Sequence, residues 1–281
     1  MTYFIYNPLA ANKHGEEIKD KALVELKNDF KEINVINAVE TNIEEFIKNI
    51  NETDIIIISG GDGTLNIFAN YVKKYDLKND FYLYQGGSGN DFLNDVGSDE
   101  KITKLNKYLE NLPVVEINKE KRYFLNNASF GIDGEVCVVA DKLREKGKKK
   151  INYTMIAIKL LLFNFKRPNA KVIIDGKEFD YKKVWLASAI NGRYIGGGMM
   201  FTPEQDRLSD KFSCVVLHKS SRLRTLMAFP KLTAGKYKKY PKLIDIIECN
   251  KIEVVFDKPT GLQVDGEVYK NVTSYVAYKQ K

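Results

Sequence analysis

The segment Ile55-Ile-Ile-Ile-Ser-Gly-Gly-Asp-Gly-Thr-Leu-Asn66 is the most informative part of this chain about its architecture. It opens with a β-branched run of the kind that fills central strands of parallel sheets, which are buried on both faces. A glycine turn follows directly, and residues 65–74 then show the apolar spacing of a helix. A buried strand that passes through a glycine turn into a helix is the building unit of a doubly wound α/β domain.

The first third of the chain repeats this alternation of strand and helix. Thr41 or Asn42 is the expected N-cap of the second helix. Because parallel strands need crossover helices, which are right-handed, we predict an α/β domain with a doubly wound parallel sheet in residues 1–118. The pattern predicts strands at residues 3–6, 33–36, 54–58 and 81–84, and helices at residues 16–30, 42–50 and 65–74.

The pattern changes near residue 115, after which strand-like stretches follow one another. Turn signals such as Asp175-Gly176 separate them, and helices are expected only within residues 135–164 and 221–235. Residues 119–281 are therefore predicted to form a β-rich domain of the sandwich type, whose last strand can return to the first domain. The strand-like stretches are residues 123–125, 170–174, 183–187, 212–217, 252–256 and 272–278.

Composition narrows the function classes. The 281 residues include three cysteines without a CxxC pair and two histidines, which excludes a disulfide framework, a thiolate zinc site and a histidine-rich metal centre. No apolar run reaches the roughly 18 residues that span a bilayer, and the N-terminus lacks the pattern of a signal peptide. We therefore expect a cytoplasmic protein.

The net charge of +7 is compatible with nucleic acid, an anionic membrane or phosphate-bearing substrates. Basic side chains gather at residues 142–150 and 236–242, and the first run leads into the apolar residues 151–163. A basic segment before an apolar helix favours peripheral attachment to an anionic membrane surface, with no nucleic acid partner. A solvated charged turn before a core helix explains the same pattern equally well.

The glycine turn has the chemistry of a phosphate site. Glycines allow the backbone to approach an anion, and the free amides and dipole of the following helix bind phosphate oxygens. The negative charge of Asp62 suits this place if its carboxylate holds Mg²⁺, as phosphoryl transfer requires. The turn is formed by Gly60, Gly61, Asp62, Gly63 and Thr64.

A second loop, Tyr82-Leu-Tyr-Gln-Gly-Gly-Ser-Gly-Asn-Asp-Phe92, repeats the arrangement. Both loops follow strands of the same predicted sheet, so both open on its carboxyl edge, where α/β proteins bind ligands. Ser88 can donate a hydrogen bond to a phosphate, and Asp91 supplies a second acid near the metal.

Motifs spread over nearly the whole chain resemble a known family. Besides the two loops, these are Asn7-Pro8, Phe124-Leu-Asn-Asn-Ala-Ser-Phe-Gly-Ile-Asp133, Asn191-Gly-Arg-Tyr-Ile-Gly-Gly-Gly-Met-Met-Phe-Thr-Pro203 and Gln263-Val-Asp-Gly-Glu267. In this order they resemble the catalytic fold of the diacylglycerol kinase family. That family includes bacterial lipid kinases and sphingosine kinases and, more distantly, NAD kinases and 6-phosphofructokinases.

The resemblance implies an ATP-dependent lipid kinase that transfers the γ-phosphate to the hydroxyl of a membrane lipid such as diacylglycerol, with ATP and Mg²⁺ as cofactors. Asp62 and Glu267 would be the catalytic residues, because Glu267 would accept the proton of the lipid hydroxyl. A hairpin turn at Val264-Asp-Gly-Glu267 is the alternative explanation of that motif. The implied ATP contacts are Asn7, Thr41, Gly60, Gly61, Asp62, Gly63, Thr64, Asn66 and Ser88, and the acids that organise Mg²⁺ through waters are Asp62, Asp91 and Glu116.

The chain departs from the family pattern at several positions. Ile67 stands where the family usually has Glu, and Ser88 and Glu116 stand where it usually has Thr and Asp. The loop that holds a structural Mg²⁺ in the family has Ser209 at the expected Asp position. Its flanking acids, Asp206 and Asp210, are the candidate ligands there.

Two alternatives stand beside the lipid kinase. An NAD kinase shares the first glycine loop, but the second loop and the Asp-Gly-Glu segment favour the lipid branch. A catalytically weak nucleotide-binding or lipid-binding protein would explain Ile67 and the altered metal loop. The sequence leaves the identity of the lipid and the formation of a homodimer open.

Overall fold

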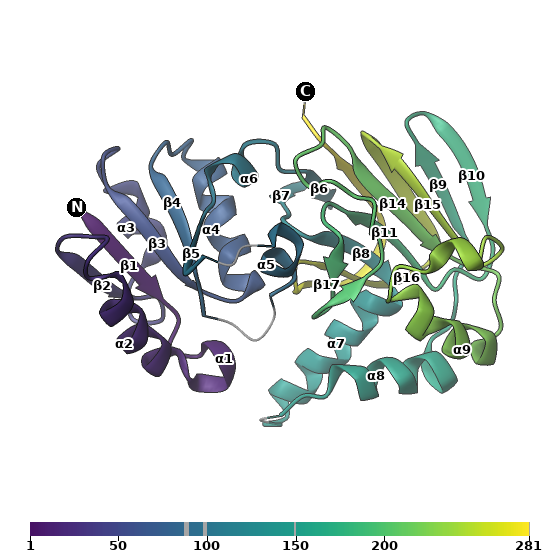
Figure 1. Cartoon of the computed structure of the whole chain (residues 1–281). Helices are drawn as coiled ribbons and strands as arrows, with labels where there is room; N and C mark the ends of the chain where they lie inside the picture. The colour runs from purple at the N-terminus through teal and green to yellow at the C-terminus, as the bar shows by residue number, and fades with distance from the viewer. Residues whose placement is uncertain (87–89, 98–99, 149, 281) are drawn as a thin grey trace. The chain divides into compact units, whose positions relative to one another are not determined.

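The computed structural model describes residues 1–86, 90–97, 100–148 and 150–280 (Figure 1). The chain divides into two compact units, each described here by itself. The first comprises Met1–Leu112 together with Gly196–Gly198, and the second comprises Pro113–Ile195 and Met199–Lys281. This division lies six residues before the predicted boundary at residue 118 and assigns the last strand to the second unit.

The first unit is built on a five-stranded sheet with the order β2-β1-β3-β4-β5. Four of its strands are parallel, as predicted. The fifth, β5, runs antiparallel to β4, and its three residues are too few to show a period in the sequence. The strands are β1 (Thr2–Tyr6), β2 (Ile33–Asn37), β3 (Ile55–Gly60), β4 (Asp80–Gln85) and β5 (Ile102–Lys104).

Helices connect these strands, and apolar side chains of α2 pack against those of the sheet. Asn42 is the N-cap of α3, since its side chain accepts a hydrogen bond from the Glu45 amide at 3.2 Å. The predicted helix at residues 16–30 ends earlier, where the amides of Asp29 and Phe30 turn back to the carbonyl of Leu26. The helices are α1 (Ala10–Lys13), α2 (Gly15–Leu26), α3 (Ile43–Lys48), α4 (Asp62–Lys74), α5 (Asp91–Val96) and α6 (Asn106–Glu110).

The second unit contains a ten-stranded sheet whose strand pairs are all antiparallel. Its long strand β16 pairs with β9 through Ile252–Phe256 and with β8 through Leu262–Val264, with register shifts between the two parts. The strands are β6 (Val114–Ile117), β7 (Glu120–Tyr123), β8 (Asn127–Gly131), β9 (Ala170–Ile174), β10 (Lys177–Tyr181), β11 (Leu186–Ile190), β14 (Phe212–Leu217), β15 (Ile244–Cys249), β16 (Lys251–Val264) and β17 (Glu267–Tyr278).

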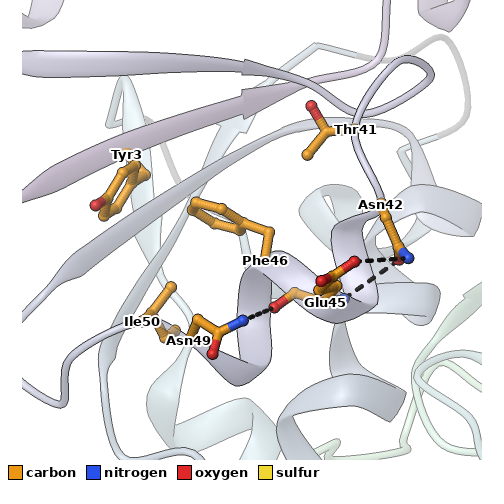
Figure 2. A pocket seen from close by; sticks show the side chains of 7 residues that line it. All are labelled: Tyr3, Thr41, Asn42, Glu45, Phe46, Asn49 and Ile50. Carbon is orange, nitrogen blue, oxygen red and sulfur yellow. Dashed lines mark hydrogen bonds between the residues drawn. The ribbon is translucent and has the colours of Figure 1, made fainter.

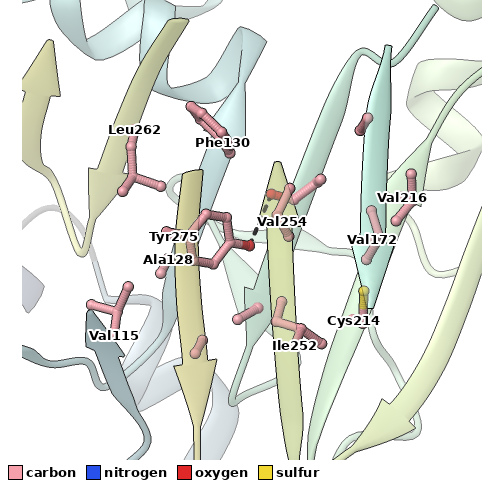
Figure 3. Close-up of a cluster of buried hydrophobic side chains, with 14 of the residues drawn as sticks. Val115, Ala128, Phe130, Val172, Cys214, Val216, Ile252, Val254, Leu262 and Tyr275 are labelled. Atoms are coloured by element: carbon pink, nitrogen blue, oxygen red, sulfur yellow. Dashed lines mark hydrogen bonds between the residues drawn. The ribbon is translucent and has the colours of Figure 1, made fainter. Parts of the chain in front are cut away.

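One buried cluster joins these strands into the predicted sandwich-type core (Figure 3). The rings of Phe130 and Phe256 stack at 4.2 Å between centroids. Tyr275 lies beside Phe130 and donates its hydroxyl to the carbonyl of Ala187 at 3.1 Å, so its polar end is satisfied within the core. Both halves of the long strand therefore contribute to a single core.

Helices and a short two-stranded sheet complete the second unit, and they pack around the buried Trp185 in a second cluster. No helix among the described residues is both long and apolar enough to cross a membrane. The remaining elements are α7 (Ile132–Glu145), α8 (Tyr153–Lys159), the π-helix η1 (Leu160–Asn164), α9 (Arg222–Leu232), the 3₁₀-helix η2 (Tyr237–Lys239), β12 (Tyr194–Ile195) and β13 (Met199–Met200).

Two predicted strands have the wrong bounds. Of residues 123–125, Tyr123 ends β7 and the other two fall between β7 and β8, where the amide of Leu125 donates to the Asp265 side chain instead of to a strand. The strand expected at residues 183–187 begins only at Leu186, because Lys183 has a φ of 54°, which ends an extended strand. In both cases the apolar residues that suggested a strand belong to a buried connecting segment.

Candidate functional site

The glycine turn of the first unit joins β3 to α4. A side chain at Gly60 would bring its Cβ within 2.6 Å of the Thr64 Cβ. At Gly86, which follows β4, an added Cβ would lie 2.3 Å from the Ser59 Oγ. Both loops therefore need glycine for close packing, and they lie next to each other at the carboxyl edge of the sheet.

Asn7 joins this edge from β1. Its Nδ2 lies 3.5 Å from the Thr64 Oγ1, and its Oδ1 accepts a hydrogen bond from the Leu9 amide at 2.9 Å. Asn66 lies further along α4, where it is buried and its Oδ1 accepts from Asn70 at 3.2 Å. The thirteen-residue helix α4 thus begins at a turn that carries amides and small polar side chains, which suits a phosphate group.

The carboxylate of Asp62 binds the second loop. Its Oδ2 accepts the Asp91 amide at 2.9 Å and its Oδ1 accepts the Phe92 amide at 3.0 Å. These are the first two amides of α5, and Asp62 is itself the first residue of α4. The charge therefore stabilises the start of two helices, a role that the sequence argument did not consider when it assigned the charge to Mg²⁺ alone.

Asp91 has the same kind of surroundings. Its two carboxylate oxygens accept the amides of Gly197 at 2.8 Å and Gly198 at 2.5 Å. Direct metal coordination by either acid would have to compete with these charge-assisted bonds. A carboxylate oxygen can accept more than one hydrogen bond, so a cation held through waters is compatible with these contacts.

Thr41 lies in a cavity of about 370 Å³ that also contains Tyr3 and α3 residues (Figure 2). The rings of Tyr3 and Phe46 meet edge to face at 5.0 Å and form its apolar wall. Among the described residues that were predicted to contact ATP, this cavity includes Thr41 alone. Ser88, another predicted contact, lies outside the described residues.

In the second unit, the predicted Val264-Asp-Gly-Glu267 turn is the hairpin between β16 and β17. Asp265 and Gly266 have φ values of 44° and 93°, as a two-residue hairpin of the primed type requires. The Asp265 carboxylate accepts the amides of Leu125, Asn126 and Asn127 at 2.5, 3.0 and 2.9 Å. This acid therefore joins the hairpin to the motif at residues 124–133.

Glu267 is the first residue of β17, and its side chain is 48% exposed. Its Oε1 lies 3.1 Å from the Arg122 Nη2 and accepts the Tyr269 hydroxyl at 3.3 Å. Arg122, which sequence reasoning missed, can orient this carboxylate while leaving it accessible to an alcohol. No motif contains Arg122, so only its place on β7 beside the hairpin identifies it.

Asp133, at the start of α7, is a second acid near this motif. Its Oδ2 accepts the Gln263 amide group at 2.8 Å and faces the Asn127 side chain at 3.5 Å. Burial raises the pKa of Asp133, and these hydrogen bonds act in the opposite direction. A carboxyl with a raised pKa can exchange protons nearer neutral pH, which suits the sequence-based choice of Asp133, with Asp265, as the next candidate base after Glu267.

The other predicted metal ligands lie elsewhere in the second unit. Glu116, on β6, accepts the Tyr278 hydroxyl at 2.8 Å and pairs with Lys121 at 3.1 Å, and these two contacts lower its pKa. Asp206 and Asp210 are exposed, and the Asp206 Oδ1 accepts the Leu208 amide at 2.9 Å. Within the described residues, no group of three or more Asp, Glu, His or Cys side chains is arranged to hold a metal.

Comparison with known families covers nearly the whole chain. Residues 1–118 match the diacylglycerol kinase catalytic domain. Residues 126–278, which are more than half of the chain, match the YegS C-terminal NAD kinase beta sandwich-like domain. The two matches follow the two-part architecture, and the first contains both glycine loops.

Sequence relatives and solved structures agree with these matches. A candidate lipid kinase of Staphylococcus haemolyticus is 28% identical over 80% of this chain and 74% of its own length. One from Staphylococcus aureus is 26% identical over 82% and 74%. A candidate diacylglycerol kinase of Bacillus anthracis has the same fold, with a TM-score of 0.73 at 19% identity over 100% of this chain and 92% of its own. Yeast NADH kinase is more distant, with a TM-score of 0.50 at 10% identity over 100% and 80%.

Proposed function

Because this chain belongs to the diacylglycerol kinase family, we propose that it transfers the γ-phosphate of ATP to the hydroxyl group of a membrane lipid such as diacylglycerol. Membership of a lipid kinase family supports a phosphotransferase. The observation that carries the finer proposal is the Asp62 carboxylate, which joins the two glycine loops at the N-termini of α4 and α5.

The nucleotide phosphates are proposed to bind at the start of α4. The amides of its first turn and its dipole attract anions, and the approach of Gly60 and Gly86 leaves no side chain in the way. Asn7 and Thr64 lie together beside this turn and can donate hydrogen bonds to phosphate oxygens. The same residues would bind ADP after transfer.

Asp62 and Asp91 are proposed to hold waters around the magnesium ion of the nucleotide. Their oxygens already accept backbone amides, which fixes both carboxylates in orientation and leaves room only for indirect contact. When bound, Mg²⁺ would neutralise charge on the transferring phosphate. The two acids also hold the start of α5 in place, so they organise the site in the absence of a ligand.

Glu267 is proposed to take the proton of the acceptor hydroxyl. The alcohol oxygen then forms a bond to the γ-phosphorus as the bond from that phosphorus to ADP breaks, and the proton stays on the Glu267 carboxylate. The exposed side chain and the Arg122 contact support this role, since the acid is held in place without being covered.

The lipid is proposed to be reached through a face formed by α8, η1 and α9, which we call the apolar face. Arg222 ties these elements together, donating to the carbonyls of Leu161 at 2.6 Å and Phe165 at 2.9 Å. Phe163, Leu223 and Met227 lie on this face and are 73%, 63% and 64% exposed. Exposed apolar side chains suit a membrane, and the basic run at residues 142–150, which precedes α8 in the chain, suits an anionic one.

Radiolabelled ATP with a panel of lipids in mixed micelles tests the proposal. We expect label in a phospholipid product for at least one long-chain alcohol. The Glu267→Gln variant serves as the inactive control. Formation of NADP from NAD would instead support an NAD kinase, and binding of ATP without transfer to any lipid would support a nucleotide-binding protein.

A further inference from the structure

The loop after Pro203 is tightly organised by buried polar side chains. Gln205 is buried, and its Nε2 donates to the carbonyls of Asp206 at 2.8 Å and Lys211 at 3.0 Å. Its Oε1 accepts the Ser213 hydroxyl at 2.6 Å. These bonds close the loop across residues 205–213 through neutral groups that belong to the chain itself.

A buried cation closes the other side of the loop. Lys279, which follows β17, is 6% exposed, and its Nζ donates to the carbonyls of Ser209 at 2.5 Å and Arg207 at 3.3 Å. Backbone carbonyls that converge on one point are the hard oxygen ligands that Mg²⁺ and Ca²⁺ prefer. Here the point is occupied by an ammonium group.

Arg207 adds a second positive charge. Its guanidinium is buried and donates to the Leu125 carbonyl at 2.7 Å and the Asn126 Oδ1 at 2.8 Å. A divalent cation at the Ser209 and Arg207 carbonyls would have to displace the Lys279 ammonium and would be repelled by the buried Arg207 guanidinium. The carboxylates of Asp206 and Asp210 are exposed, and Asp206 turns one oxygen to the Leu208 amide. The donor set does not fit the structural Mg²⁺ of the family.

We propose that the ammonium of Lys279 takes the place of a divalent cation in this loop, so that residues 205–211 keep their conformation without metal. The absence of an acid at Ser209 follows from this replacement, because an ammonium satisfies carbonyls and needs no carboxylate ligand. The consequence for the enzyme is that Mg²⁺ is needed with the nucleotide and not for the fold of the second unit.

The charge of Lys279 persists at neutral pH. Burial lowers its pKa to about 8, with Arg207 acting in the same direction and Asp210 and Asp206 opposing it. Burying an ammonium costs free energy, which explains this direction. Removing the side chain would nevertheless destabilise the fold, because the hydrogen bonds from the ammonium to these two carbonyls would be lost.

Thermal unfolding of the nucleotide-free protein tests the proposal directly. The melting temperature is measured after exhaustive treatment with EDTA and again with several millimolar MgCl₂. We expect the two values to agree within about 1 °C, since nothing in the loop depends on metal. A clear fall on chelation that MgCl₂ reverses would overturn the proposal, whatever the protein phosphorylates.

A variant tests the role of the ammonium itself. Lys279→Met keeps most of the side-chain volume but removes the charge and its hydrogen bonds. We expect a melting temperature roughly 3–8 °C below that of the wild type, from the loss of about two hydrogen bonds in a chain of this size. Lys258→Met, at an exposed lysine of β16, is the matched control and should shift by less than about 1 °C. A normal melting temperature for Lys279→Met would overturn the proposal, and if that variant fails to fold, the EDTA measurement decides.

Discussion

The two places where the sequence predicts magnesium differ in the charges that surround them. At the glycine loops of the first unit, the carboxylates of Asp62 and Asp91 are held by backbone amides. In the loop of the second unit, the ammonium of Lys279 holds two backbone carbonyls, and the guanidinium of Arg207, a residue of this loop, binds the carbonyl of Leu125.

The difference lies in the hydrogen-bond partners that the protein itself gives to the carboxylates and to the carbonyls. Amides that point at a carboxylate keep it negative, so the first place can still attract a hydrated cation. Carbonyls that already accept hydrogen bonds from an ammonium do not require a metal ion as a partner. A metal ion that approached them would be repelled by the charges of Lys279 and Arg207. An acidic or polar loop therefore predicts a metal only if the rest of the fold does not supply the counter-charge.

The largest effect is expected at Asp62. Asp62→Ala removes the proposed water contact to Mg²⁺ and also frees the amides that start α5, which carries Asp91. Phosphoryl transfer should fall on the order of 10⁴-fold, while circular dichroism stays native. Asp62→Asn keeps the shape and one acceptor oxygen but removes the negative charge. It therefore distinguishes the effect of the charge from that of the hydrogen bonds to α5. Retention of more than a few per cent of the wild-type rate by both variants would contradict the role of this acid.

Glu267→Gln should have the next largest effect. The change keeps the shape and the hydrogen bond to Tyr269 but removes the basicity, so kcat should fall on the order of 10²–10⁴-fold. KM for ATP should change little, because the proposed phosphate site lies in the other unit. Steady-state kinetics with a lipid acceptor provide the measurement. Normal turnover would move the base to Asp133 or Asp265, which lie in the same region of the second unit.

Membrane attachment should show a smaller effect. Replacing Lys148, Lys149 and Lys150 with Gln removes attraction worth about 1 kcal/mol for each basic side chain near an anionic surface. Co-sedimentation with phosphatidylglycerol vesicles should decrease and become less sensitive to salt. Replacing the three exposed lysines Lys177, Lys182 and Lys258 with Gln removes the same net charge elsewhere and is the control. Equal loss in both proteins would leave the basic run as a solvated turn.

The smallest effect is expected at the loop of the second unit, residues 205–213. Asp206→Asn and Asp210→Asn remove the acids that a structural metal would need, yet the loop is closed by Gln205 and Lys279. Activity and melting temperature should stay within about twofold and about 2 °C of the wild type. A large loss of stability in the double variant that added MgCl₂ reverses would show that this loop binds a metal ion. The proposed difference between the two regions would then be wrong.

Local patterns explain what could be predicted. The run at residues 55–58, the glycine turn and the start of α4 follow one another in the chain, so their order is visible in the letters. The Asn42 cap and the Asp265-Gly266 hairpin also depend on neighbours within a few residues. These features needed no knowledge of distant contacts.

The failures involve partners that lie far apart in the chain. Residues 123–125 look like a strand, but the amide of Leu125 meets the side chain of Asp265, which is 140 positions away. Lys279 stands in an unremarkable tail, and only the folded chain brings it to Ser209. Arg122 is likewise identified as a site residue only by its contact with Glu267.

The family, the doubly wound sheet and the β-rich second part could be predicted from the order of the amino acids, because period, turn chemistry and motif order are local properties of the chain. The balance of each charge became visible only in the folded chain. Whether a carboxylate faces two amides or a carbonyl faces an ammonium depends on contacts between residues that the chain order keeps apart, and electrostatic energies at a few ångströms depend on those contacts above all.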